Sequence, residues 1–197
     1  MARPIELTEA LRSEYAKLFS AAAIRDAWKD RVSMALDRAL RGRARYRSVG
    51  APMRVPWLWI AAIHSLESDA DFTTHLHNGD PLTRRTRQVP AGRPPAGKPP
   101  FTWEASATDA LTLKSLDVWE DWSICGMLFQ AERYNGWGYR RFHPGILSPY
   151  LWSGTFHYTR GKYIADGQWS PSAVSQQVGA AAILKLAASR GMDVTGT

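Results

Sequence analysis

Apolar side chains recur at helical spacing along the first forty residues. Thr8 is a residue type that caps helices, and the positions after it place apolar side chains on one face up to about Phe19. A second apolar series recurs every four residues, at Ile24, Trp28, Val32, Leu36 and Leu40. The pattern predicts two amphipathic helices. The arginine-rich stretch 41–47 is predicted to be a basic connector ending at Gly50, either a solvated linker or a contact for an anionic partner.

The most apolar segment of the chain follows this connector. Pro56 suits the first turn of a helix, and the residues from Trp57 to Ile63 make that helix apolar on nearly every side. We therefore expect a central buried helix, which ends at about Glu67.

Turn-forming residues dominate the next stretch. Asn78-Gly79 and the Thr-rich residues around it predict a β-hairpin or an irregular β-arm. Residues 89–100 contain five Pro and two Gly, a composition that excludes a helix or a central strand. We expect a semi-rigid loop on the rim of a cleft, and the alternative is a linker between two lobes.

The C-terminal half shows three further helical patterns. The capping-box spacing that begins at Ser106 predicts a helix over 106–116, and a second helix is expected over 118–132. Gly and aromatic residues dominate 134–169, which predicts an ordered loop over a cleft floor. Ser-Pro at the start of 170–189 predicts a final, Ala-rich helix.

Composition and charge restrict the class of protein. A chain of 197 residues with 45% hydrophobic and 22% charged residues fits one folded domain. The lone Cys125 excludes an internal disulfide and suits a reducing compartment. No apolar segment of signal-peptide type opens the chain, and stretch 55–63 is about half the ~20 residues that cross a bilayer. We expect synthesis in the cytoplasm without a signal peptide and without stable membrane insertion. The net charge of +7 indicates an anionic partner: nucleic acid, a membrane face or the cell wall.

Glu67 is the candidate for catalysis. It lies in the last turn of the apolar helix, where the negative end of the helix dipole and the apolar surroundings both disfavour its ionised form. Its pKa is therefore predicted to be raised. A carboxyl that stays protonated near neutral pH is what a general acid for glycosidic cleavage requires. The alternative is a glutamate that ends the helix and points into solvent.

Several sequence blocks resemble glycan-cleaving enzymes. The segment 63–68 (IHSLES), followed by Phe72, resembles the catalytic-glutamate segment of goose-type lysozymes and lytic transglycosylases. The segment 131–136 (AERYNG) resembles the Tyr-Asn motif that lines the sugar site in those families. The longer blocks 132–139 and 148–167 are similar to bacterial and phage proteins of the lysozyme family.

The resemblance implies a lysozyme-like α+β fold in one domain, residues 1–197, with residues 1–50 forming helices packed on the core. A small β-hairpin arm and the Tyr-Asn loop are then expected on the two sides of an active-site cleft. The implied activity is that of a peptidoglycan hydrolase, a muramidase that cleaves the β-1,4 bond between N-acetylmuramic acid and N-acetylglucosamine. Such a protein fits a phage or prophage endolysin that reaches the cell wall after release through a permeabilised membrane.

The second catalytic group remains open at this point. The order Glu67, Asp80, Thr86 resembles that of phage-type lysozymes, although the twelve residues between the first two are more than the phage pattern has. In that arrangement Asp80 orients a water against the anomeric carbon and Thr86 helps to hold it, as in an inverting hydrolase. The alternative is attack by the sugar's own 6-hydroxyl, as in lytic transglycosylases, which use one carboxyl only.

The remaining candidates concern substrate contact. The proposed sugar-binding residues are His77, Tyr134, Asn135, Trp137 and Tyr139. His75 and His77 could in principle ligate zinc, but no HExxH sequence or Cys pair supports a metal site. Asp166 is predicted to be a turn residue.

Two other classes of function compete with an enzyme. Arg84, Arg85 and Arg87 could meet nucleic-acid phosphates, yet no nucleic-acid-binding motif accompanies them, and attraction to an anionic wall is the simpler explanation. A non-catalytic wall-binding module would share the aromatic residues but would not need a carboxyl at a buried helix end. We expect peptidoglycan as the partner, no nucleic acid, no cofactor, no metal, and a monomer.

Overall fold

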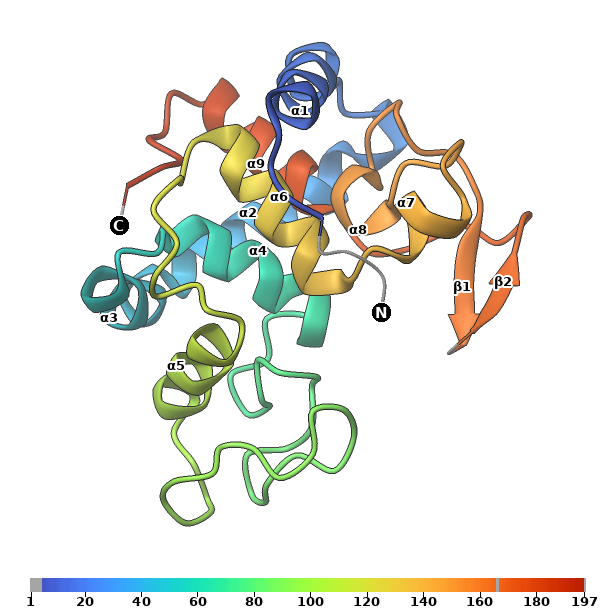
Figure 1. Ribbon diagram of the computed structural model, residues 1–197. Coiled ribbons are helices and arrows are strands. Elements are labelled where there is room, and N and C mark those ends of the chain that lie inside the picture. Colours follow the sequence, from blue (N-terminus) through green and yellow to red (C-terminus); the bar gives the residue numbers. More distant parts are fainter. Residues whose placement is uncertain (1–4, 166, 197) are drawn as a thin grey trace.

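The computed structural model describes residues 5–165 and 167–196, so the predicted turn at Asp166 lies outside the described residues. These residues form an α+β fold that is mainly helical, with a two-stranded antiparallel sheet (Figure 1). The elements in chain order are α1 (Glu9–Ala21), η1 (Asp26–Trp28), α2 (Lys29–Arg41), α3 (Arg43–Met53), α4 (Trp57–Ser68), α5 (Trp103–Leu113), α6 (Ile124–Asn135), α7 (Gly138–Phe142), α8 (Pro149–Trp152), β1 (Lys162–Ala165), β2 (Gln168–Ser170) and α9 (Ala180–Ser189). None of the described helices combines the length and the apolar character needed to cross a membrane.

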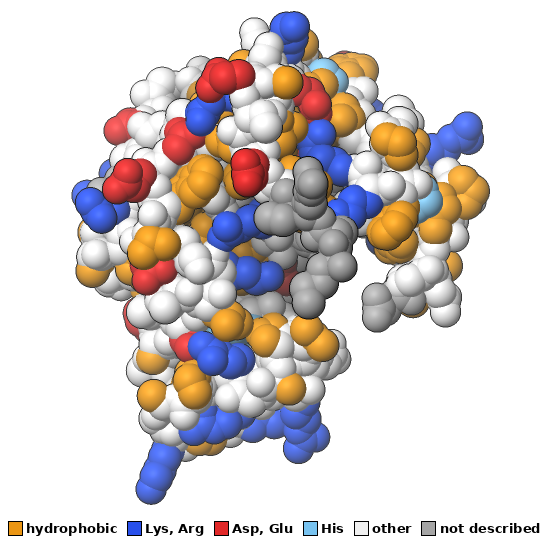
Figure 2. Space-filling view, in the orientation of Figure 1, with side chains coloured by type: hydrophobic (Ala, Val, Ile, Leu, Met, Phe, Trp, Pro, Cys, Tyr) orange, Lys and Arg blue, Asp and Glu red, His pale blue; other side chains and the backbone are white. Residues whose placement is uncertain are grey.

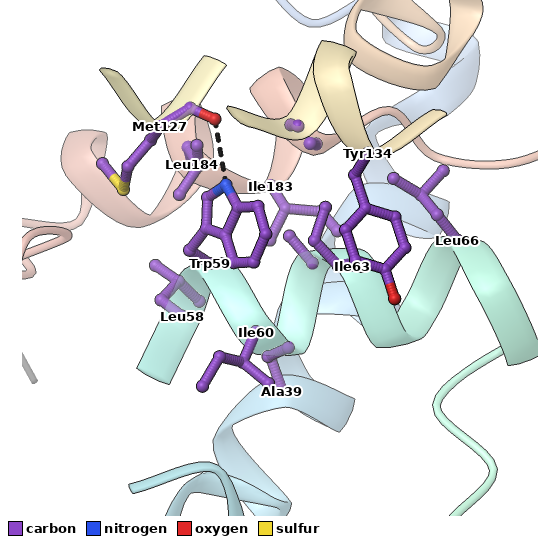
Figure 3. Close-up of a cluster of buried hydrophobic side chains, with 14 of the residues drawn as sticks. Ala39, Leu58, Trp59, Ile60, Ile63, Leu66, Met127, Tyr134, Ile183 and Leu184 are labelled. Carbon is purple, nitrogen blue, oxygen red and sulfur yellow. Dashed lines mark hydrogen bonds between the residues drawn. The ribbon is translucent and has the colours of Figure 1, made fainter. Parts of the chain in front are cut away.

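Helix α4 forms the centre of the fold, as its apolar sequence predicts. Side chains on all its sides are buried, and the helix contacts α2, α3 and α9. The indole nitrogen of Trp59 donates a hydrogen bond to the carbonyl oxygen of Met127 on α6 at 2.9 Å (Figure 3). Asp69 ends the helix in the left-handed region, with φ of 52°. The apolar packing therefore fixes the C-terminal end of α4, where Glu67 lies.

The two N-terminal helices are also confirmed. The Thr8 hydroxyl accepts a hydrogen bond from the Leu11 amide at 3.3 Å and caps α1, which packs on α6 through Leu11 and Tyr15. The predicted connector after α2 is wrong, because residues 43–53 form α3 instead. Apolar residues at helical spacing are present among the arginines. Tyr46 and Val49 are buried against α4, while the charged side chains point outward.

The arm, residues 69–102, lies below the helical body in Figure 1 and runs into α5. The predicted hairpin is wrong, because the described arm contains a single isolated bridge, Thr74 to Pro81, and no strand. The arm is irregular, as the alternative prediction has it, but its β-structure is limited to this one bridge. Prolines remove backbone donors here, and polar side chains supply the hydrogen bonds that strands would otherwise make.

The C-terminal half departs from the predicted boundaries. Helix α5 begins at Trp103 with the Thr102 hydroxyl as its cap, because the Ser106 hydroxyl binds the His75 ring at 2.7 Å instead. Helix α6 begins only at Ile124, because the Ser123 hydroxyl caps it by accepting from the amide of Gly126 at 3.3 Å.

The predicted loop 134–169 contains two short helices and strand β1, which pairs with β2 in the register Lys162 to Ser170. Ser170 therefore ends a strand, and the final helix begins at Ala180 rather than at residue 170. The β1–β2 hairpin projects from the right of the body in Figure 1. The sheet thus lies apart from the arm, although the sequence predicts a hairpin in the arm.

Candidate active site

Glu67 lies in the last turn of α4 with its side chain half-buried. The Tyr150 hydroxyl on α8 donates a hydrogen bond to Glu67 Oε1 at 2.7 Å. Burial raises the pKa of Glu67 from its ordinary 4.5 to about 7, while the Tyr150 hydrogen bond and the nearby charge of Lys114 act in the opposite direction. The carboxyl is therefore about half protonated at neutral pH, in line with the sequence prediction of a raised pKa.

Two surface hollows include the end of α4, and a third shares residues with each of them. The arm hollow has a volume of about 360 Å³ and is lined by Glu67, His77, Asn78, Lys114, Tyr134 and Asn135. The hairpin hollow has a volume of about 490 Å³ and is lined by Asn135, Tyr139, Phe142, Tyr150, Tyr163 and Gln177. The α2 hollow has a volume of about 450 Å³ and is lined by Arg31, Met34, Arg38, Glu67, Asp69 and Gln177.

Shared lining residues connect these hollows into one groove. Asn135 belongs to both the arm hollow and the hairpin hollow, and Glu67 belongs to both the arm hollow and the α2 hollow. Figure 2 shows the surface hollowed between the lobe formed by the arm and the lobe formed by the hairpin. A polymer that occupies the arm hollow and the α2 hollow would contact Glu67.

The predicted Tyr-Asn pair lines the groove, and its two members differ. Tyr134 is buried, and its hydroxyl donates to the carbonyl oxygen of Leu76 at 2.9 Å, which ties α6 to the arm. Asn135 is exposed at the end of α6, and its amide has no hydrogen-bond partner among the described residues. Tyr134 therefore builds the wall, and Asn135 is the member available to a ligand.

His77 lines the arm hollow but is held by α5. Its Nε2 lies 2.8 Å from the Asp109 carboxylate, which also accepts from Arg93 Nε at 2.9 Å. Burial lowers the pKa of His77, and Asp109 acts in the opposite direction. A neutral His77 donating to Asp109 connects the arm with α5 and leaves only part of its ring facing the groove.

Asp80 and Thr86 make hydrogen bonds to backbone groups within the arm. Asp80 Oδ2 accepts from the amides of Arg87 at 2.8 Å and Gln88 at 3.2 Å, and the pKa of Asp80 is lowered mainly by the Arg87 amide. The Thr86 hydroxyl is buried, donates to the Pro90 carbonyl oxygen and accepts from the Arg93 amide at 2.9 Å. Neither side chain lines a hollow that contains Glu67. Both shape the loop that forms one wall of the groove.

The two remaining aromatic candidates also separate. The Tyr139 ring lines the hairpin hollow and contacts Tyr163 edge-on, with ring centroids 5.5 Å apart. Trp137 packs against Phe129 at a centroid distance of 5.3 Å and lines none of the three hollows. Tyr139 thus lines a wall of the hairpin hollow, whereas Trp137 supports the core.

Three residues of the site escaped the sequence reasoning. Tyr150 is the direct partner of the Glu67 carboxyl, Lys114 places a cation near it, and Gln177 donates to the Leu66 carbonyl oxygen at 2.6 Å. Tyr150 lies within the block 148–167 that carries the family resemblance, so a signal for it existed. Nothing local in the sequence distinguishes the other two.

Metal chemistry has no ready ligand set in the part of the chain that the structure describes, where no group of three His, Cys, Asp or Glu side chains converges. The His75 ring is instead hydrogen-bonded to Ser106 and to the Arg84 carbonyl oxygen, at 2.7 Å and 2.8 Å. The zinc alternative therefore gains no support from these residues. No protein-family model matches the chain, and no curated protein or solved structure matches it either.

Proposed function

We propose that this protein cleaves the β-1,4 bond between N-acetylmuramic acid and N-acetylglucosamine in peptidoglycan, with Glu67 as the general acid. One observation carries the proposal: a carboxyl with a pKa of about 7 lies where two hollows of a groove meet. A mainly helical α+β body with an arm beside the groove is consistent with the lysozyme-like fold that the sequence resemblance implies, although the described arm has no hairpin. The corresponding biological role is that of a phage or prophage endolysin, which reaches the cell wall after release through a permeabilised membrane.

The first chemical step is proton transfer from Glu67 to the glycosidic oxygen. Tyr150 donates to Oε1, which orients the carboxyl and leaves Oε2 to carry the proton. Burial raises the pKa of Tyr150 well above its ordinary value, so this hydroxyl stays a donor throughout. The nearby Lys114 charge stabilises the carboxylate that forms when the proton leaves.

The groove offers matching contacts for a glycan. The free amide of Asn135 can bond to an N-acetyl group, and the aromatic rings of Tyr139 and Tyr163 in the hairpin hollow suit the faces of pyranose rings. An acidic residue buried at a groove is needed for cleavage and not for binding alone, so the site favours an enzyme over a wall-binding module.

A lytic transglycosylase is the second candidate, and the state of Asp80 and Thr86 favours it. Asp80 Oδ2 and the Thr86 hydroxyl already bond to backbone groups of the arm, and neither side chain lines a hollow that contains Glu67, so neither is placed to hold a water beside that carboxyl. In this route the 6-hydroxyl of muramic acid attacks its own C1 while the leaving sugar takes the Glu67 proton. The hydroxyl proton then returns to the Glu67 carboxylate, and a 1,6-anhydro ring results.

Mass spectrometry of digested peptidoglycan tests both candidates. In water enriched in heavy oxygen, a hydrolase yields reducing muramic ends that carry the label, and a transglycosylase yields unlabelled 1,6-anhydro ends. Glu67→Gln should release neither product, whereas Glu120→Gln, a matched change at an exposed glutamate, should leave the digest unchanged. A wild-type digest without soluble glycan fragments would contradict the proposed function.

A further inference from the structure

The α2 hollow differs chemically from the other two. It is formed by one face of α2, where Arg31, Met34 and Arg38 follow each other at helical spacing, together with the end of α4. Met34 is 56% exposed and offers apolar surface between two guanidinium groups. The hollow shares Glu67 with the arm hollow, so a ligand inside it lies beside the proposed reaction.

Arg31 carries the uncompensated charge of this hollow. Its Nη1 donates to Gln176 Oε1 at 2.9 Å, and its guanidinium lies 5.1 Å from the centroid of the Trp28 ring. These neutral contacts orient the side chain, and no carboxylate pairs with it within the described residues. Arg38, by contrast, is paired with Asp69. Arg31 is therefore ready to receive an anionic oxygen.

The cationic row continues beyond the hollow. Arg38 and Asp69 also line a neighbouring hollow of about 510 Å³ that contains Arg41. Arg31, Arg38 and Arg41 thus follow α2 over a length of about 15 Å, at 1.5 Å of rise per residue. This length suits an extended peptide of about four residues.

We propose that the α2 hollow is the subsite for the stem peptide of the glycan strand, with Arg31 contacting a peptide carboxylate. The inference rests on the proposed function. In peptidoglycan the peptide hangs from O3 of the muramic acid whose C1 bears the scissile bond, so it leaves the sugar next to the general acid. A stem peptide combines carboxylates with apolar alanine side chains, and the hollow offers both guanidinium groups and the Met34 surface.

Steady-state kinetics on two forms of one substrate test the subsite. The substrate is a soluble glycan oligomer with stem peptides, used with free carboxylates and after conversion of the carboxylates to amides. Arg31→Gln should raise KM about fivefold for the free-carboxylate form while kcat changes by less than about twofold. The same variant should leave KM for the amidated form unchanged. Arg47→Gln, at an exposed arginine of α3 outside the three hollows, is the control and should match wild type on both forms.

The outcomes separate this inference from the proposed function. Equal KM values for Arg31→Gln and Arg47→Gln on the free-carboxylate form would overturn the subsite, even if Glu67→Gln still abolished cleavage. A soluble glycerol phosphate polymer can be added as a competitor. If it raises KM for wild type but not for Arg31→Gln, and if amidation of the substrate has no effect, the hollow binds phosphate. That result would also overturn the stem-peptide subsite. If Glu67→Gln still cleaved the substrate at the wild-type rate, the result would instead contradict the proposed function.

Discussion

The ends of α4 and α6 each carry a glutamate that is largely removed from solvent, and the two differ in ways that bear on the proposed role of Glu67. Glu67 and Glu132 both lie near the C-terminal end of a buried helix, and burial raises the pKa of both. Each accepts a tyrosine hydroxyl, from Tyr150 at 2.7 Å and from Tyr15 at 2.5 Å. Burial and a tyrosine partner therefore do not distinguish the two sites.

The neutralising cation distinguishes them. Glu132 Oε2 also accepts from Arg140 Nε at 2.9 Å, and Arg140 pairs with Glu14 on α1 at 2.9 Å. This network joins α1, α6 and α7, and the Arg140 charge opposes the rise in the pKa of Glu132 that burial causes. Glu67 makes no ion pair among the described residues, so its proton stays available to a substrate in the groove. A raised pKa without a salt bridge is the feature that separates the proposed general acid from the glutamate of the ion-pair network.

Exchange of each glutamate for glutamine gives the largest contrast, in activity. Glu67→Gln should lower kcat at least about 100-fold, because general acid catalysis contributes about that much and the amide cannot donate the proton. Glu132→Gln should retain kcat per folded molecule within about threefold. Initial rates on purified peptidoglycan, corrected for the folded fraction, measure both. Residual activity of Glu67→Gln above about 10% of wild type would remove the distinction between the sites.

The same two variants should separate in the opposite sense in stability. Glu132→Gln breaks a buried ion pair and leaves Arg140 with only the half-exposed Glu14 as a carboxylate partner among the described residues, so it should lower the free energy of unfolding by about 3 kcal/mol. Urea unfolding at pH 7 measures this loss, and an unchanged midpoint would contradict the structural role of Glu132.

Glu67→Gln should instead stabilise the protein at alkaline pH. The folded-state pKa of about 7 lies above the ordinary value of 4.5, so the native state binds the proton more tightly and wild-type stability falls as pH rises between these values. The glutamine variant lacks this loss and should be more stable than wild type by about 1 to 2 kcal/mol at pH 8, a figure reduced for partial exposure. At pH 4 the two proteins should unfold at the same urea concentration. Equal free energies of unfolding for the two proteins at pH 8 would show that the ionised Glu67 carboxylate does not destabilise the fold.

A smaller effect concerns the alkaline limb of the pH profile. Activity should fall above about pH 7 as Glu67 ionises. The Tyr150 hydrogen bond lowers the pKa of Glu67, so Tyr150→Phe should move this limb upward by up to about one pH unit. Lys114→Met should move it in the same direction, because a positive charge is lost. A limb that stays in place in both variants would exclude Glu67 as the titrating group.

The sequence predicts the central helix and its glutamate well, because both depend on local pattern. An apolar run with no polar face can only be buried, and a carboxyl at its end must then be partly desolvated. The connector 41–50 fails for the complementary reason: its arginines outnumber the few apolar side chains, such as Tyr46, that make it a helix. Hydrophobic periodicity predicts a helix only where charged residues do not outnumber the apolar residues that become buried.

The arm and the partners of Glu67 lie beyond local pattern. The arm has no strand to predict, since its shape depends on individual side chains such as Asp80 and Thr86 bonding to backbone groups several residues away. Tyr150 stands 83 residues after Glu67 in the chain, so no spacing rule connects the two. The candidate acid could therefore be found from sequence, while the hollows around it required the fold.

Titration of the Glu67 carboxyl tests the central claim most directly. Carbon NMR of protein labelled at the glutamate side-chain carboxyl carbon, with Glu67→Gln to assign the resonance, follows this single group as pH changes. We predict a midpoint near pH 7, because burial opposes the anion at the end of α4. A midpoint near the ordinary value of 4.5 would contradict the assignment of Glu67 as an acid that keeps its proton at neutral pH.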